Sequence, residues 1–295
     1  MLLKINNLDV YYGKTHALHL TEPLTIEEGD RIGIIGSNGA GKSTLIKSLL
    51  GINHYQGFIE SQVHPQEMAV HMQFNEYSES MSCRHVMEAI LQTSVKKNKE
   101  LQELINYFEF DPSLNKKYKS LSGGQKQRFT IILVMMQNAR LTFYDEVTSG
   151  LDFETRQKLM EKLVEWYQNK NSSLCIVSHY YEELEQMADK LLILDQGKVV
   201  AFGQKEALFR KFCGRSIVAL QNTPQNESLV HSYRHLAAPG HLIALSADNE
   251  EEEASIIRIL VSQNINFKRS NSDIEMTFIN AKAEYLKGET DNDQK

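Results

Sequence analysis

A glycine-rich segment of the chain combines backbone freedom with one lysine and several hydroxyl side chains, which are groups that bind phosphate. Residues 36–44 fit the pattern G-x-x-x-x-G-K-[ST]. The glycines let successive backbone N–H groups close around phosphate oxygens, while Lys42 reaches the β and γ phosphates and Ser43 ligates Mg²⁺. The pattern therefore predicts a site for a nucleoside triphosphate and Mg²⁺. Its members are Gly36, Ser37, Asn38, Gly39, Ala40, Gly41, Lys42, Ser43 and Thr44.

Two adjacent carboxylates, Asp145 and Glu146, follow the short apolar run Leu141–Tyr144. A strand over this run would deliver both carboxylates at its carboxyl end. Asp145 is expected to bind Mg²⁺, usually through the hydration shell of the ion, and Glu146 to polarise the water that attacks the γ phosphate in line. An Asp-Glu pair is also common at a solvated strand end, and it is the phosphate-binding pattern that favours a role in hydrolysis.

The segments around these residues alternate between strand and helix patterns. Arg31–Ile35 is an apolar run that ends at the glycine loop, and residues 43–50 carry apolar side chains at helical spacing. Strands that alternate with helices indicate a mostly parallel sheet covered on both faces. The further expected elements are strands at 2–10, 141–144, 174–177 and 191–194 and helices at 124–138, 153–169 and 182–188.

The sequence Leu121–Arg128, LSGGQKQR, lies between the two groups of site residues. It resembles the signature of the ATP-binding cassette (ABC) family, and the other motifs of that family stand around it in the family's order. The resemblance covers residues 2–209, including the turn Gly197–Gly203 that usually closes the cassette. It implies an α/β fold of the P-loop NTPase class, in which a RecA-like core carries an antiparallel β subdomain and an inserted α-helical subdomain.

The resemblance also implies roles for single residues of the further motifs. Tyr12 is similar to the aromatic residue that stacks on adenine, and its neighbour Tyr11 is the alternative. Gln73 would contact Mg²⁺ and the attacking water, and His179 would contact the γ phosphate and steady Glu146. Outside this order of motifs, a lone glutamine or histidine would be interpreted as an ordinary surface or structural side chain.

The signature further implies an assembly of two cassettes, because in the family it binds the γ phosphate held on the partner's phosphate loop. Asp152 would help to connect the two sites of such a homodimer or heterodimer, and residues 74–78 would line the groove that receives a membrane permease subunit. Val147 stands where the family has proline, so this turn lacks a fixed φ and is expected to be looser. The signature residues that would bind the partner's nucleotide are Ser122, Gly123, Gly124 and Gln125.

Composition shifts divide the chain of 295 residues into a large and a small part. Residues 1–214 are expected to form the nucleotide-binding domain, with the helical subdomain inserted at about 74–122. A polar stretch without periodicity predicts a linker at 215–228. A small C-terminal α+β domain is expected at 229–287, and the polar residues 288–295 are expected to be a disordered tail.

Charge and hydropathy argue against several classes of partner and location. The net charge of −6, with Lys and Arg spread along the chain, gives no reason to expect a nucleic-acid partner. The longest strongly apolar run, 129–136, is far shorter than the about 20 residues of a membrane span, and no signal peptide is expected at the start. Three widely spaced cysteines are expected to be reduced core residues of a cytosolic protein, namely Cys83, Cys175 and Cys213.

These features favour an ATPase that uses ATP and Mg²⁺ and belongs to a transporter. Residues 272–279 are similar to the acidic-aromatic ending of stand-alone ATPases of ABC-2-type exporters, although an amphipathic terminal helix of separate origin fits the same residues. The leading hypothesis is a cytoplasmic ATPase, peripheral on the inner face of the cell membrane, that powers export of a drug, antimicrobial or amphipathic peptide through permease subunits. The alternatives are a soluble ABC ATPase that drives a non-transport assembly and the ATPase subunit of an importer.

Overall fold

The computed structural model describes residues 1–293 apart from 73, 74, 76 and 169. The chain forms two compact units that are interleaved along the sequence. Unit 1 comprises residues 1–10, 21–32 and 43–179, and unit 2 comprises residues 11–20, 33–42 and 180–295. Within the described part of the chain, no helix is both long and apolar enough to span a membrane.

An antiparallel sheet forms from the first part of the chain. Its strands are β1 (Leu3–Tyr12), β2 (Thr15–Leu20), β3 (Leu24–Ile26) and β5 (Gln56–Ser61). The strand order is β2-β1-β3, and β5 also pairs with β1. Apolar residues alternate along β1, and Ile5 and Val10 are among those whose side chains are fully buried. The sheet confirms the antiparallel subdomain that the family resemblance implies.

A second sheet positions the carboxylates. Its strands, in hydrogen-bonded order, are β10 (Lys198–Gln204), β9 (Lys190–Asp195), β4 (Arg31–Ile35), β8 (Ser173–Val177), β7 (Leu141–Asp145) and β6 (Met68–His71). β6, β7 and β8 run parallel, and Asp145 at the end of β7 pairs in register with Val177 at the end of β8. The residues that follow these two strands therefore emerge at one edge of the sheet.

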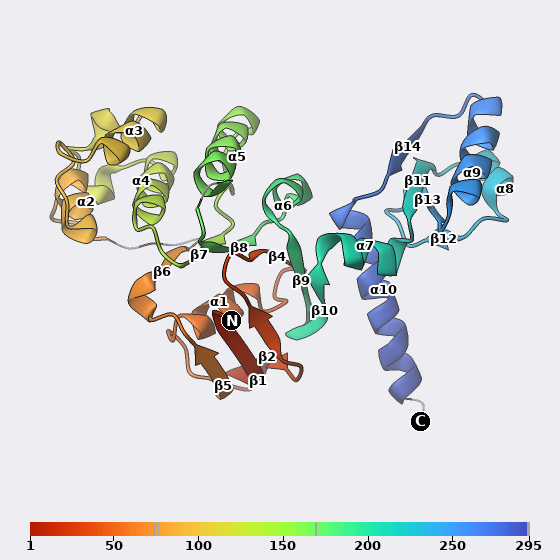
Figure 1. The fold of residues 1–295 in the computed structure, drawn as a ribbon, viewed down its shortest axis with the longest axis horizontal. Coiled ribbons are helices and arrows are strands. Elements are labelled where there is room, and N and C mark those ends of the chain that lie inside the picture. Colours follow the sequence, from red (N-terminus) through yellow and green to blue (C-terminus); the bar gives the residue numbers. More distant parts are fainter. Residues whose placement is uncertain (73–74, 76, 169, 294–295) are drawn as a thin grey trace. The chain divides into compact units, whose positions relative to one another are not determined.

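The helices before the C-terminal part are α1 (Lys42–Leu49), α2 (Cys83–Leu91), α3 (Lys99–Tyr107), α4 (Gly123–Met136), α5 (Phe153–Gln168), α6 (Tyr181–Met187) and α7 (Lys205–Cys213). Of these, α1, α4, α5 and α6 occupy the predicted positions within a few residues, α2 and α3 lie in the predicted helical insertion, and α7 was not predicted. In unit 1, α2 and α3 pack against α4 (Figure 1). The ring of Phe129 on α4 lies 5.1 Å from that of Tyr77 and 5.5 Å from that of Tyr118, which forms an aromatic core.

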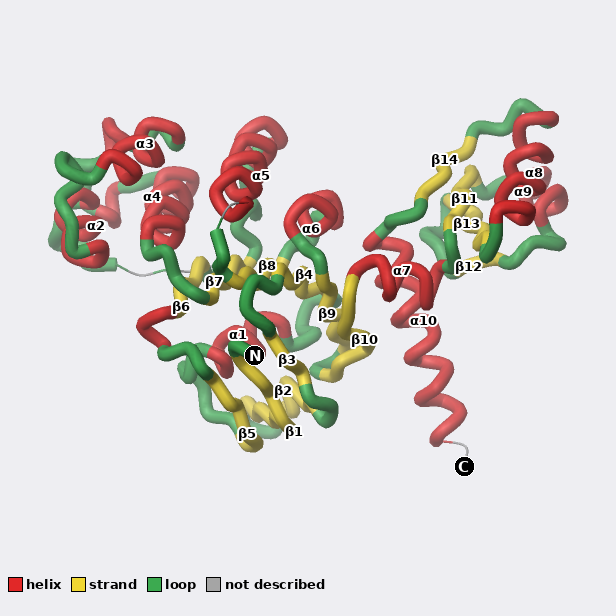
Figure 2. Tube along the Cα trace, in the orientation of Figure 1, coloured by secondary structure: helices red, strands yellow, loops and turns green. Residues whose placement is uncertain are grey.

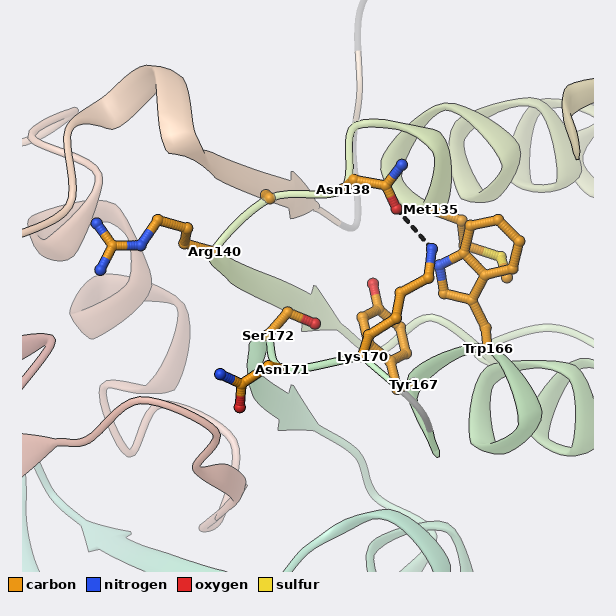
Figure 3. Close-up of a pocket in the computed structure, with 9 residues that line it drawn as sticks. Met135, Asn138, Arg140, Trp166, Tyr167, Lys170, Asn171 and Ser172 are labelled. Atoms are coloured by element: carbon orange, nitrogen blue, oxygen red, sulfur yellow. Dashed lines mark hydrogen bonds between the residues drawn. The ribbon is translucent and has the colours of Figure 1, made fainter. Parts of the chain in front are cut away.

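At the opposite end of β7 and β8, residues from the ends of α4 and α5 and from the segments before the two strands lie around one cavity (Figure 3). The ammonium of Lys170 lies 3.5 Å from the centre of the Trp166 ring and donates to the side chain of Asn138. These residues line a cavity of about 460 Å³. Because it lies at the amino ends of the strands, this cavity is remote from Asp145 and takes no part in the site described below.

The C-terminal part of unit 2 contains a four-stranded antiparallel sheet (Figure 2). Its elements are β11 (Ser216–Gln221), α8 (Pro224–Val230), β12 (His235–Leu236), β13 (Leu242–Ala247), α9 (Glu250–Ser262) and β14 (Phe267–Ser270). The strand order β12-β13-β11-β14 and the βαββαβ succession are those of the ferredoxin-like motif. Side chains of β11, β13, α8 and α9 share one apolar core.

Two predicted boundaries in this part are wrong. Residues 215–228, predicted as a linker, contain β11 in the middle of the sheet and the start of α8. The polar residues there are a helix start rather than a loop, because Thr223 caps α8 and Pro224 occupies its first turn. The last helix, α10 (Ile274–Asp293), extends into the predicted disordered tail 288–295 as far as Asp293, although this stretch is rich in residues of low helix propensity such as Gly, Asp, Asn and Thr.

Candidate nucleotide-binding and hydrolysis site

The phosphate loop, residues 36–42, lies in unit 2 and needs glycine at two positions. A Cβ on Gly36 would lie 2.3 Å from the carbonyl oxygen of Leu194. Gly41 has a φ of +99°, and a Cβ there would lie 3.0 Å from the carbonyl oxygen of Ala17. The packing of β9 and β2 against this loop therefore leaves no room for side chains at these positions.

The side chain of Lys42 is folded into this loop. It is only 7% exposed, and its Nζ donates to the carbonyl oxygens of Gly36 at 2.8 Å and Ser37 at 3.1 Å. The hydroxyl of Ser37 donates to Oδ1 of Asp195 at 3.1 Å. The loop thus places a cation among its own carbonyls, and contact of this ammonium with phosphates stays a prediction.

The next residue, Ser43, belongs to unit 1 and faces the first of the two carboxylates. Its Oγ donates to Oδ2 of Asp145 at 2.8 Å. Asp145 is 3% exposed at the end of β7. A hydroxyl and a carboxylate are oxygen donors of the kind that Mg²⁺ prefers, so these residues fit the predicted metal role.

Glu146 and His179 form the second pair of unit 1. Nε2 of His179 lies 2.8 Å from Oε1 of Glu146. The backbone N–H of Glu146 donates to the carbonyl oxygen of Val177 at 3.0 Å, so the register of β7 and β8 brings the two side chains together. Glu146 has a φ of +52°, which is uncommon for a residue with a side chain. Such local strain is often found at functional sites.

A cavity of about 540 Å³ adjoins Glu146 in unit 1. His71, the last residue of β6, forms part of its wall and is only 5% exposed. Neither ring nitrogen of His71 has a hydrogen-bond partner among the described residues. Burial lowers the pKa of this imidazole to about 4. The sequence reasoning missed His71, although it is the single polar residue in the otherwise apolar β6.

The signature residues lie at the exposed amino end of α4. Ser122 caps this helix, since its Oγ accepts from the N–H of Gln125 while the Gln125 side chain accepts from the N–H of Ser122. Gly123 and Gly124 are exposed, and a Cβ on either would meet no atom within 4 Å. The structure therefore leaves these groups accessible from outside the chain.

Asp152 caps the next helix, α5. Its carboxylate accepts from the N–H and the hydroxyl of Thr155, at 3.0 and 2.7 Å. These hydrogen bonds, the backbone one first, lower the pKa of Asp152. Asp152 therefore has a structural partner within its own chain, in addition to the connecting role that the resemblance implies.

The remaining predicted residues are an aromatic pair and a glutamine. Tyr11 and Tyr12 are both about half exposed in unit 2, and the Tyr11 ring is stacked on that of His16 with centroids 4.3 Å apart. The structure leaves either tyrosine accessible to a base. Gln73, together with residues 74 and 76 of the proposed permease groove, lies outside the described residues.

Comparisons with known proteins agree with this arrangement. The ABC transporter family model matches residues 22–149. An uncharacterized ABC transporter ATP-binding protein of Haemophilus influenzae is 32% identical over 228 residues, which cover 70% of this chain and 86% of that protein. The chain belongs to the ABC transporter family. It is the ATPase subunit of a transporter, and the predicted fold class and ATP hydrolysis are confirmed.

Two further relatives of this ABC ATPase are each 28% identical to it. The linearmycin resistance ATP-binding protein LnrL of Bacillus subtilis is matched over 80% of both chains. The methionine import ATP-binding protein MetN of Clostridioides difficile is matched over 74% of this chain and 76% of that protein. The fold is also similar to that of a solved ATP-binding subunit of an ABC transporter, with a TM-score of 0.65 and 23% sequence identity. The similarity covers 72% of this chain and 93% of the solved chain.

Proposed function

We propose that this ABC ATPase works as a dimer and powers export of a drug, antimicrobial or amphipathic peptide through separate permease subunits at the inner face of the cell membrane. The observation that carries the export direction is the match to LnrL, a linearmycin resistance protein, over 80% of both chains. An importer subunit is the second candidate, because MetN, a methionine import protein, has the same 28% identity to this chain over a slightly smaller share of both chains.

The first part of the proposal concerns binding of ATP. Either Tyr12 or Tyr11 stacks on the adenine, and the backbone N–H groups of residues 36–44 surround the phosphates. The ammonium of Lys42 turns from the loop carbonyls to the β and γ phosphates. Ser43 and Asp145, with Gln73, would hold Mg²⁺, which when bound neutralises phosphate charge.

The second part concerns hydrolysis. One oxygen of Glu146 is engaged by His179 at 2.8 Å, and we assign the other to the attacking water. As the water oxygen bonds to the γ phosphorus, its proton passes to Glu146 and the bond from phosphorus to the oxygen of ADP breaks. His179 fixes the orientation of Glu146 and donates toward the γ phosphate.

The third part concerns the assembly. Ser122, Gly123, Gly124 and Gln125 are accessible at the start of α4 and would bind the γ phosphate of a second cassette, with Asp152 between the two sites. Residues 1–214 form the cassette of this proposal. We assign residues from 215 onward, rather than from 229, to the domain after it, and the pairing of β11 within the C-terminal sheet supports this assignment.

Two experiments test the proposal. Lys42→Ala should weaken ATP binding, and an unchanged affinity would refute the role of the loop. For transport, the tagged protein is purified after mild detergent extraction of membranes. A multi-span membrane protein should accompany it, whereas soluble partners alone would favour a non-transport assembly.

The direction of transport needs a test in cells. Cells that carry the Lys42→Ala protein in place of the original should become more sensitive to amphipathic antimicrobials such as linearmycin. Unchanged sensitivity combined with loss of uptake of a nutrient would favour the importer.

A further inference from the structure

The carboxylate of Asp195 joins the phosphate loop to the C-terminal helix. Asp195 ends β9 and is 3% exposed. Its Oδ1 accepts a hydrogen bond from the Ser37 hydroxyl at 3.1 Å and lies 2.8 Å from Nζ of Lys282 on α10. All three residues belong to unit 2. The buried carboxylate of Asp195 therefore contacts both the phosphate loop and the last helix.

A buried carboxylate beside this loop creates an electrostatic problem. ATP brings several negative charges to the loop, and an uncompensated Asp195 would repel them through a medium of low dielectric constant. Burial of an unpaired charge is also unfavourable in itself. Lys282 is 31% exposed at its side chain, so its ammonium supplies a partly shielded counter-charge.

We propose that Lys282 is a positioning residue of the nucleotide site, whose ammonium neutralises Asp195 so that this carboxylate holds Ser37 without repelling the triphosphate. The inference rests on the proposed phosphate-binding role of residues 36–42. It gives the C-terminal part of the chain a function in nucleotide binding, because Lys282 lies 68 residues beyond the end of the cassette proposed at residue 214.

The surrounding contacts fix α10 in this position. The carboxylate of Glu185 on α6 accepts from the Ser272 hydroxyl at 3.0 Å and from the N–H of Ile274 at 2.9 Å. Lys205 at the start of α7 lies 3.3 Å from the same carboxylate. The start of α10 is thus tied to the elements that flank β9, which keeps Lys282 within reach of Asp195.

The same helix is tied to the C-terminal sheet. Asn280, two residues before Lys282, exchanges hydrogen bonds with the backbone of Ala237, at 2.9 Å to the N–H and 3.0 Å to the carbonyl oxygen. Ala237 directly follows β12. The helix α10 therefore links the ferredoxin-like sheet to Asp195, and a shift of that sheet would be transmitted to the counter-charge of the phosphate loop.

A cycle of variants tests the charge argument. The measurement is the dissociation constant of Mg²⁺ with the non-hydrolysable analogue AMP-PNP, taken by calorimetry on the full chain. Lys282→Met should raise this constant about tenfold, because it leaves Asp195 charged and unpaired. Lys282→Arg should stay within about twofold of the original protein, since it keeps the charge.

The decisive variant is the double substitution. Asp195→Asn with Lys282→Met removes both charges and should return the constant to within about twofold of the original value. A merely structural role of Lys282 predicts that the double variant binds as weakly as Lys282→Met or more weakly. Lys287→Met, on the same helix at an exposed position, is the matched control and should change nothing.

Stability and the loop itself are controlled separately. Thermal unfolding without nucleotide shows whether Lys282→Met is folded, and Lys282→Gln replaces it if it is not. The inference is refuted if the folded single variant binds within about twofold of the original, or if the double variant is not restored. Lys42→Ala is measured alongside, so that retained binding there refutes the phosphate loop and not only the part of Lys282.

Discussion

Acidification should destabilise this ABC ATPase through the buried imidazole of His71. Burial lowers its pKa from the ordinary 6.5 to about 4 in the folded chain. Between these two pH values the unfolded chain binds a proton at His71 and the folded chain does not, so the free energy of unfolding decreases as the pH falls. The difference between the two pKa values corresponds to about 3 kcal/mol, lost progressively between pH 6.5 and 4 and constant below.

The assay is urea unfolding followed by circular dichroism at intervals from pH 7.5 to 4. Carboxylates titrate in the same range, so the contribution of His71 is the difference between the original chain and His71→Leu, which cannot be protonated. Over this pH range the free energy of unfolding of the variant should decrease by about 3 kcal/mol less than that of the original chain. His71→Gln serves if leucine does not fit, and exposed His54→Gln is the matched control for loss of a surface imidazole. Equal pH dependence of His71→Leu and the original chain would refute the reasoning.

Three further changes have expected outcomes. Glu146→Gln should lower the rate of phosphate release by roughly 10²–10⁴-fold while ATP binding is kept and a closed dimer accumulates on gel filtration; near-normal turnover would remove Glu146 from the role of base. Gly36→Ala should weaken AMP-PNP binding, measured by calorimetry, roughly tenfold or more, because the added Cβ would lie 2.3 Å from a backbone carbonyl oxygen. Unchanged affinity would contradict the packing of the loop. Burial raises the pKa of the thiols of Cys83, Cys175 and Cys213, and that of Cys213 to about 12. Ellman's reagent at pH 8 should therefore label these thiols only after denaturation. Rapid labelling of the native chain would show that the thiols are not buried.

Short-range patterns predicted the parts of the site that are contiguous in sequence. The glycine loop, the strand before Asp145 and the helix α4 each follow from a local rule, and the structure has them within a few residues. The pairing of Glu146 with His179 was expected from the family resemblance alone. Its physical origin is the register of β7 and β8, which no local pattern encodes.

The C-terminal part shows why the other elements and contacts of the fold could not be predicted from local patterns. The strand β11 is short and is followed by polar residues, and its burial depends on the two neighbours β13 and β14. Local polarity therefore predicted a linker where the fold has a central strand. The contact between Asp195 and Lys282 joins residues 87 positions apart, and each residue alone has the character of an ordinary surface charge.

Val147 illustrates how tertiary contacts replace a local constraint. Without the proline of related cassettes, the turn after Glu146 was expected to be looser, because φ is no longer fixed. In the structure the Val147 side chain is 1% exposed, and its carbonyl oxygen accepts a hydrogen bond from the side chain of Gln127 on α4. Burial of the Val147 side chain supplies a constraint in place of the proline ring, while the hydrogen bond uses a backbone carbonyl that either residue provides. Because Gln127 lies on the helix that begins with the signature, this hydrogen bond ties the turn next to the proposed base to the helix proposed to contact the second cassette.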